Sequence, residues 1–121
     1  MAGILSVLSD ALEEIEVPYE FGEWTRKLQY PYSVGNFEED EHRYEDGYTG
    51  GTFTLNVWSR TSNLSLLEIK EKIKKKFEDL RVVQEGTAFF ITYEQGELIP
   101  SGEQGLYRLR ITLKTQEWEG E

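Results

Sequence analysis

The side chains with the clearest potential for catalysis are His42 and the acids around it. His42 is the sole histidine in the chain and lies between Glu38-Glu-Asp-Glu41 and Glu45-Asp46. A catalytic histidine needs a nucleophile to activate or a carboxylate to orient it, and no motif here supplies either. A serine nucleophile of the Gly-x-Ser-x-Gly type is also missing from the sequence. We therefore expect His42 to be an exposed loop residue, and we predict no catalytic residues.

The same acidic run could in principle offer oxygen ligands to a divalent cation. However, Glu38-Glu-Asp-Glu41 lacks the alternating ligand spacing and the glycine of a calcium-binding loop. The chain has no cysteine, which excludes a thiolate metal site and a disulfide. Gly47, Gly50 and Gly51 precede a strand but match neither a dinucleotide fingerprint nor a P-loop. We predict no metal, no cofactor and no enzyme activity.

Charge is abundant and unevenly distributed. The formal net charge of -10 argues against autonomous binding to a phosphate backbone. Lysines crowd residues 70–76, and Arg108, Arg110 and Lys114 share one side of the last predicted strand. Two interpretations stay open: a solvated helix face with Glu/Lys neighbours, or acidic and basic surfaces that meet between copies of the chain.

The element best placed to organise these residues is a strand, turn and helix between Gly50 and Leu80. In Thr52–Trp58, Phe53, Leu55 and Val57 alternate with polar residues and with Trp58, which indicates a strand with one buried face. The following apolar residues have helical spacing: Leu66, Ile69, Ile73, Phe77 and Leu80. The spacing of Ser65 and Glu68 predicts a capping box at the start of this helix.

The other elements are predicted from the same periodicities. Leu5, Leu8, Leu12 and Ile15 indicate a first helix. The predicted strands are 17–21 at an edge, 30–35, 87–93 and 106–114; 22–29 is irregular, 94–105 is a loop, and Asp46-Gly47 is a turn. We predict one α+β domain over residues 1–121, with two layers: a mostly antiparallel sheet of four to five strands and two helices on one face.

No apolar run approaches the ~20 residues that cross a bilayer, so no membrane contact is expected. The N-terminal residues lack the basic region of a signal peptide and continue into Glu13 and Glu14. A soluble intracellular domain is therefore expected.

Several aromatic residues are difficult to place in one small core. Trp58 points away from Phe53, Leu55 and Val57, and Trp24, Trp118, Tyr30 and Tyr32 have no clear core position. Aromatic residues concentrate at protein interfaces because they bury a large area with few rotatable bonds. One interpretation is that Trp58 packs beneath a loop. The other is that Trp58, Arg108, Arg110 and Lys114 form an interface, which is the site we predict.

Taken together, three stretches resemble a known family. The first stretch is Tyr30-Pro-Tyr-Ser-Val-Gly35, and the second is Gly51-Thr-Phe-Thr-Leu-Asn-Val-Trp-Ser59 with the amphipathic helix after it. The third is Tyr107-Arg-Leu-Arg-Ile-Thr-Leu113. In this order they resemble the tail terminator (tail completion, head–tail joining) proteins of long-tailed bacteriophages. The resemblance covers most of the chain in length and element order. The acidic segment Glu38–Asp46 and the Tyr-Ser after Pro31 depart from that pattern.

The resemblance implies a structural virion protein and no reaction. Such a protein caps the tail tube, ends its polymerisation and joins the tail to the head connector. It is usually a ring of six through which the genome passes, without sequence-specific nucleic acid binding. It is located in the virion tail or neck after assembly in the bacterial host cytoplasm. The family supplies no catalytic residues to transfer to this chain.

Three alternatives stay open. One is another phage neck or head-completion component. A second is an acidic, monomeric regulatory module that binds a basic protein. The third and weakest is a small hydrolase with an unrecognised carboxylate site.

Overall fold

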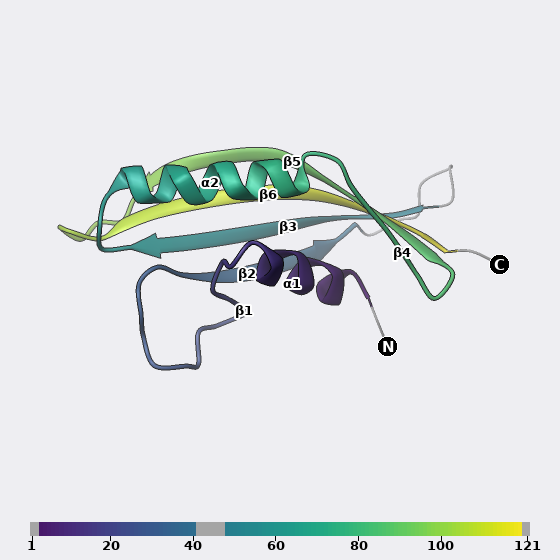
Figure 1. Cartoon of the computed structure of the whole chain (residues 1–121), viewed down its shortest axis with the longest axis horizontal. Helices are drawn as coiled ribbons and strands as arrows, with labels where there is room; N and C mark the ends of the chain where they lie inside the picture. Colours follow the sequence, from purple (N-terminus) through teal and green to yellow (C-terminus); the bar gives the residue numbers. More distant parts are fainter. Residues whose placement is uncertain (1–2, 41–47, 120–121) are drawn as a thin grey trace.

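The computed structural model describes residues 3–40 and 48–119. Two helices and six strands follow one another along the chain (Figure 1). Their bounds are α1 Ile4–Glu14, β1 Tyr19–Phe21, β2 Tyr32–Glu39, β3 Tyr48–Ser59, α2 Asn63–Phe77, β4 Leu80–Gln84, β5 Thr87–Pro100 and β6 Tyr107–Glu119. The α+β class predicted from the sequence is confirmed.

The six strands form one sheet in the order β1-β2-β3-β6-β5-β4. All neighbouring strands are antiparallel except β1 and β2, which run parallel. β3 and β6 pair along almost their whole length, from Tyr48 opposite Trp118 to Ser59 opposite Tyr107. The strand predicted at the centre of the chain's organisation is thus at the centre of the sheet.

The core lies between this sheet and both helices. Phe53, Leu55 and Val57 of β3 are buried on the face predicted from their alternation. They join inward residues of β5 and β6 and buried residues of the helices in a single cluster: Val7, Leu8, Ala11, Leu12, Leu66, Ile73, Phe77, Phe89, Ile91, Leu109, Ile111 and Leu113. Figure 1 shows α1 and α2 on the same side of the sheet. Neither helix in the described part of the chain has the length and apolar character needed to cross a membrane.

The expectation of four to five strands was wrong, because β4 was missed. Leu80, assigned to the helical stripe, begins β4 after α2 has ended at Phe77. The β4–β5 hairpin turns through Glu85 and Gly86, which both have positive φ angles of 48° and 81°. A two-residue loop with this geometry matches the twist of the strands it joins. The five residues of β4 are too few to show a strong alternation in the sequence.

The loop expected over residues 94–105 was also wrong for its first half. β5 continues to Pro100 after a register shift between Tyr93 and Gln95, so only residues 101–106 connect it to β6. This extra length comes through a β-bulge, which a strict alternation of polar and apolar residues does not predict.

Helix α2 begins earlier than the predicted capping box. Ser62 is the N-cap, and its hydroxyl accepts a hydrogen bond from the backbone N–H of Ser65 at 3.1 Å. Ser65 therefore lies inside the first turn and does not cap the helix. The Ser59 hydroxyl, 3.0 Å from that of Ser65, ties the end of β3 to this turn.

Gly35 occupies a close approach between two aromatic rings. Tyr19 of β1 and Phe53 of β3 meet edge to face across β2, with ring centroids 5.9 Å apart. A Cβ atom on Gly35 would stand 2.5 Å from Phe53 Cζ and 2.6 Å from Tyr19 Cε1. The absence of a side chain at Gly35 therefore allows the two rings to pack over the strand.

Candidate interaction surface

The sheet face opposite the helices carries every residue of the predicted interface. We call this surface the open face, because no described helix covers it. Strand register aligns Tyr32, Trp58 and Arg108 across β2, β3 and β6, and Asn56 beside Arg110. The same register aligns Thr52 with Lys114 further along. The four predicted residues, Trp58, Arg108, Arg110 and Lys114, therefore share one face, although Lys114 lies further along β6 from Trp58.

Trp58 is part of an aromatic group, which we call the tryptophan–tyrosine cluster: Trp24, Tyr30, Tyr32 and Trp58. Tyr32 stacks on Trp58 with centroids 5.1 Å apart and planes 16° from parallel. Trp24 and Tyr30 pack against Tyr32 at 5.2 Å and 5.4 Å. Trp58 is half-buried and faces away from the core, as predicted. Its large surface is covered partly by Tyr32.

An arginine lies over each outer ring of this cluster. The guanidinium carbon of Arg26 lies 4.4 Å from the centre of the Trp24 ring. The guanidinium carbon of Arg60 lies 5.2 Å from the centre of the Tyr30 ring, and that of Arg108 lies 5.6 Å from the centre of the Trp58 ring. Trp, Tyr and Arg are the residues most enriched where binding energy concentrates in protein interfaces. Cation–π contacts also hold the arginines in place before any partner arrives.

The Arg108 guanidinium is fixed by a neutral partner. Its Nε and Nη2 groups both donate to Oδ1 of Asn56, at 3.1 Å and 2.9 Å. Asn56 is almost fully buried on the open face, with an exposed fraction of 9%. Because an amide carries no charge, Asn56 sets the orientation of the Arg108 guanidinium without neutralising its positive charge. Asn56 and Tyr32 were not predicted as site residues; their place in register with Arg108 and Trp58 is the signal that would have identified them.

The other two cations differ in their partners. Arg110 Nη2 lies 2.5 Å from Oε1 of Glu97 on β5, in an exposed ion pair. Lys114 Nζ donates to the hydroxyl of Thr52 at 2.9 Å and makes no ion pair within the described residues. Within residues 3–40 and 48–119, Arg108 and Lys114 are therefore the cations of the predicted set that lack a carboxylate partner.

A second aromatic group lies at the opposite end of the open face. Trp118 packs against Tyr48 at 4.9 Å and against Phe90 at 6.4 Å, and Arg81 lies over Phe90. Trp118 had no predicted position, and the antiparallel register of β3, β5 and β6 accounts for it. Aromatic groups thus flank a polar band of threonines and cations in the middle of the face.

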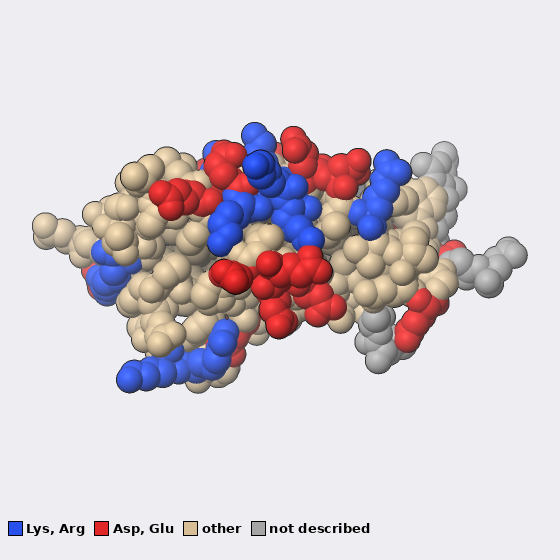
Figure 2. Space-filling view, viewed as in Figure 1, with Lys and Arg blue, Asp and Glu red and all other residues tan. Residues whose placement is uncertain are grey.

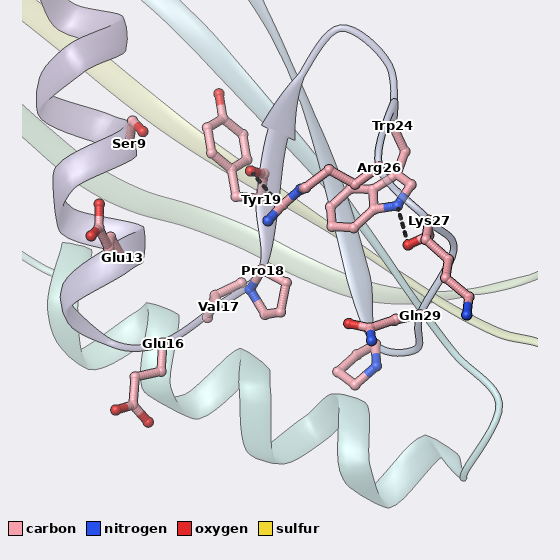
Figure 3. A pocket seen from close by; sticks show the side chains of 11 residues that line it. Ser9, Glu13, Glu16, Val17, Pro18, Tyr19, Trp24, Arg26, Lys27 and Gln29 are labelled. Atoms are coloured by element: carbon pink, nitrogen blue, oxygen red, sulfur yellow. Dashed lines mark hydrogen bonds between the residues drawn. The ribbon is translucent and has the colours of Figure 1, made fainter.

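A polar pocket of about 500 Å³ opens beside β1, between the C-terminal end of α1 and residues 24–31 (Figure 3). Glu20 holds this loop: its carboxylate accepts hydrogen bonds from the Thr25 hydroxyl at 2.6 Å, and from Thr25 N, Arg26 N and Arg26 Nε. These bonds, above all that from the Thr25 hydroxyl, lower the pKa of Glu20 to about 2. These hydrogen bonds to Glu20 explain how residues 22–29, which have no regular secondary structure, keep Trp24 packed against Tyr32.

The pocket offers little chemistry of its own. Its lining mixes Glu13, Glu16, Arg26 and Lys27 with Tyr19, whose hydroxyl is buried and has no hydrogen-bond partner among the described residues. Burial raises the pKa of Tyr19 to about 12, so this hydroxyl keeps its proton at neutral pH and is a poor general base. Among the described residues, no three or more histidine, aspartate or glutamate side chains are arranged so that they could hold a metal ion. His42, the acids Glu41, Glu45 and Asp46, and the Asp46-Gly47 turn lie outside the described residues.

No protein-family profile matches this sequence, and no curated protein does. A solved structure whose name states no function is similar in fold. It covers 98% of this chain and 99% of its own, with a TM-score of 0.65 and 13% sequence identity. At this identity the similarity shows the fold alone.

Proposed function

We propose that this chain is a structural phage or prophage tail assembly protein that caps the tail tube, ends tube polymerisation and joins the tail to the head connector. It acts as a homo-oligomeric ring, of six copies in the resembled family, and catalyses no reaction. Its partners are the tail tube protein and the neck or connector proteins. It resides in the tail or neck of the virion after assembly in the host cytoplasm.

The observation that carries the proposal is the open face itself. Both helices pack on the other side of the sheet, so no described helix covers Trp58, Arg108 or Lys114, and Trp24 and Tyr30 pack against Tyr32 beside them. A half-buried tryptophan beside a fixed arginine is typical of a surface that binds protein. The resemblance of the strands around Gly35 and Trp58 to tail terminators supports the particular assembly.

Charge supports the same role. A net charge of -10 suits a ring whose lumen lets DNA slide without sticking. The site residues Trp58, Arg108, Arg110 and Lys114 would then contact protein, where charge complementarity sets orientation.

The experiment is tube assembly in the presence of the chain. The tail tube protein of the same phage or prophage is polymerised with and without the purified chain, and tubes are imaged by negative-stain electron microscopy. We expect extra density at one tube end and shorter tubes as the chain concentration rises. Tubes of unchanged length with bare ends at saturating chain would contradict the proposal. A monomer that instead binds one basic protein would favour the regulatory module.

A further inference from the structure

The helix layer carries an acidic surface at α1 and at the residues that directly follow this helix. Asp10, Glu13, Glu14 and Glu16 are all exposed. Figure 2 shows acidic side chains gathered over α1, directly beside basic side chains over α2. Lys76 pairs with Glu14 across this boundary. Asp10, Glu13 and Glu16 make no ion pair within the described residues; we call these three the α1 acids.

Cations without a carboxylate partner among the described residues also lie on the opposite layer, the open face. Arg108 and Lys114 project from the open face, and each has a neutral oxygen as its partner in place of a carboxylate. A sheet separates the two surfaces, since the α1 core residues Leu8 and Leu12 pack on its other side. The α1 acids and these cations therefore cannot meet within one chain, but they can meet between two.

We propose that the α1 acids of one copy dock on Arg108 and Lys114 of the open face of the next copy. This inference rests on the proposed function and specifies the contact between subunits of the ring. Because the two surfaces differ, the contact is head-to-tail, and each copy keeps one free surface of each kind. Repetition of such a contact gives a closed ring when the rotation per subunit permits.

A second copy fits this surface better than a nucleic acid does. A phosphate backbone binds to a concentrated cationic surface, whereas the open face offers Arg108 and Lys114 beside the Arg110–Glu97 ion pair. The same chain carries both the α1 acids and these cations. The contact would also cover Trp58 and Tyr32, whose stacked rings adjoin Arg108. Burial of these rings around an already oriented guanidinium reduces the ordering cost of association.

The first test uses cysteine cross-linking, which is free of background because the chain has no native cysteine. Glu13→Cys and Thr112→Cys variants are prepared separately, the second on the open face between Arg110 and Lys114. We expect oxidation of the equimolar mixture to give the mixed disulfide dimer in an excess over either homodimer well above the twofold excess of random pairing. A 1:2:1 ratio of the three dimers, or monomer alone, would overturn the head-to-tail contact.

The second test is charge reversal, followed by sedimentation velocity with circular dichroism to verify folding. Arg108→Glu and Glu13→Arg should each weaken self-association by at least about 30-fold, and the mixture of the two should recover a heterodimer. Lys114→Glu is an exposed second variant that leaves the Asn56 contact intact. Lys75→Glu, an exposed site on α2 with the same charge change, is the matched control and should associate normally. Equal weakening by Lys75→Glu, or no recovery on mixing, would overturn the proposal.

These measurements are separate from tube capping. A chain that caps tubes but self-associates without these residues retains the proposed function and refutes this contact. A chain that self-associates through these residues but leaves tubes uncapped retains this contact and refutes the proposed function.

Discussion

Gly35 gives the most quantitative test of the packing that supports the open face. In Gly35→Ala the new Cβ would lie 2.5 Å from Phe53 Cζ and 2.7 Å from Phe53 Cε1, whereas ordinary van der Waals contact begins at 3.4 Å. Phe53 is fully buried in the centre of the core, so its ring has no free space to enter. Tyr19, at the edge strand, can move aside more easily.

Overpacking of this kind costs about 1–3 kcal/mol, and we place Gly35→Ala at about 2–3 kcal/mol because the ring it meets cannot move. For a domain of this size that corresponds to a fall in Tm of roughly 6–15 °C. Urea denaturation followed by tryptophan fluorescence measures the free energy of unfolding. Gly3→Ala, where a Cβ meets nothing within 4 Å, is the matched control and should change it by less than about 1 kcal/mol.

A double-mutant cycle identifies the cause. Phe53→Leu lowers stability by itself but removes the ring that blocks the new methyl group. We expect Gly35→Ala to cost about 1–2 kcal/mol less in the Phe53→Leu background than in the wild type. A cost of Gly35→Ala below about 0.5 kcal/mol, or one that is unchanged by Phe53→Leu, would refute the reasoning.

Three further predictions concern single polar groups. Ser62→Ala removes the N-cap acceptor of Ser65 N and should cost about 1 kcal/mol in chemical denaturation; no loss would show that the helix is capped otherwise. Glu20 should titrate near pH 2 in NMR, because its hydrogen bonds, above all that from the Thr25 hydroxyl, favour the charged carboxylate. The stability that this carboxylate contributes should be lost as pH falls from about 4.5 to about 2. A titration midpoint near 4.5 would show that these bonds do not form in solution. Glu117 has a pKa raised by burial and by nearby acids, so its ionisation opposes folding as pH rises. Glu117→Gln should therefore raise the denaturation midpoint at pH 7 more than at pH 4, and an equal gain at both would exclude the charge as the cause.

The central strand and the core face could be predicted because their signal is local. Phe53, Leu55 and Val57 alternate with polar residues, and Leu109, Ile111 and Leu113 do the same, so each strand indicates its own buried side. In the sheet these two sets of three residues lie opposite each other on β3 and β6. Sequence periodicity alone does not specify this pairing. The same alternation placed Trp58, Arg108 and Arg110 on one face.

What could not be predicted depends on contacts between distant segments. The Arg108–Asn56 bonds join residues 52 positions apart in the chain, and no local pattern indicates them. The missed strand β4 owes its position to pairing with β5. The start of α2 at Asn63 depends on the hydroxyl of a single N-cap residue, Ser62. The stacking of Tyr32 on Trp58 required the register between β2 and β3.

The most direct test of the central claim is sedimentation velocity of the wild-type chain beside the Trp58→Ala, Arg110→Ser double variant. Both substitutions lie on the open face, and the Arg110–Glu97 pair is exposed enough to contribute little to folding. If this face assembles the protein, the wild type sediments as an oligomer and the variant as a monomer with an unchanged circular dichroism spectrum. Identical sedimentation of the two folded proteins would contradict the account.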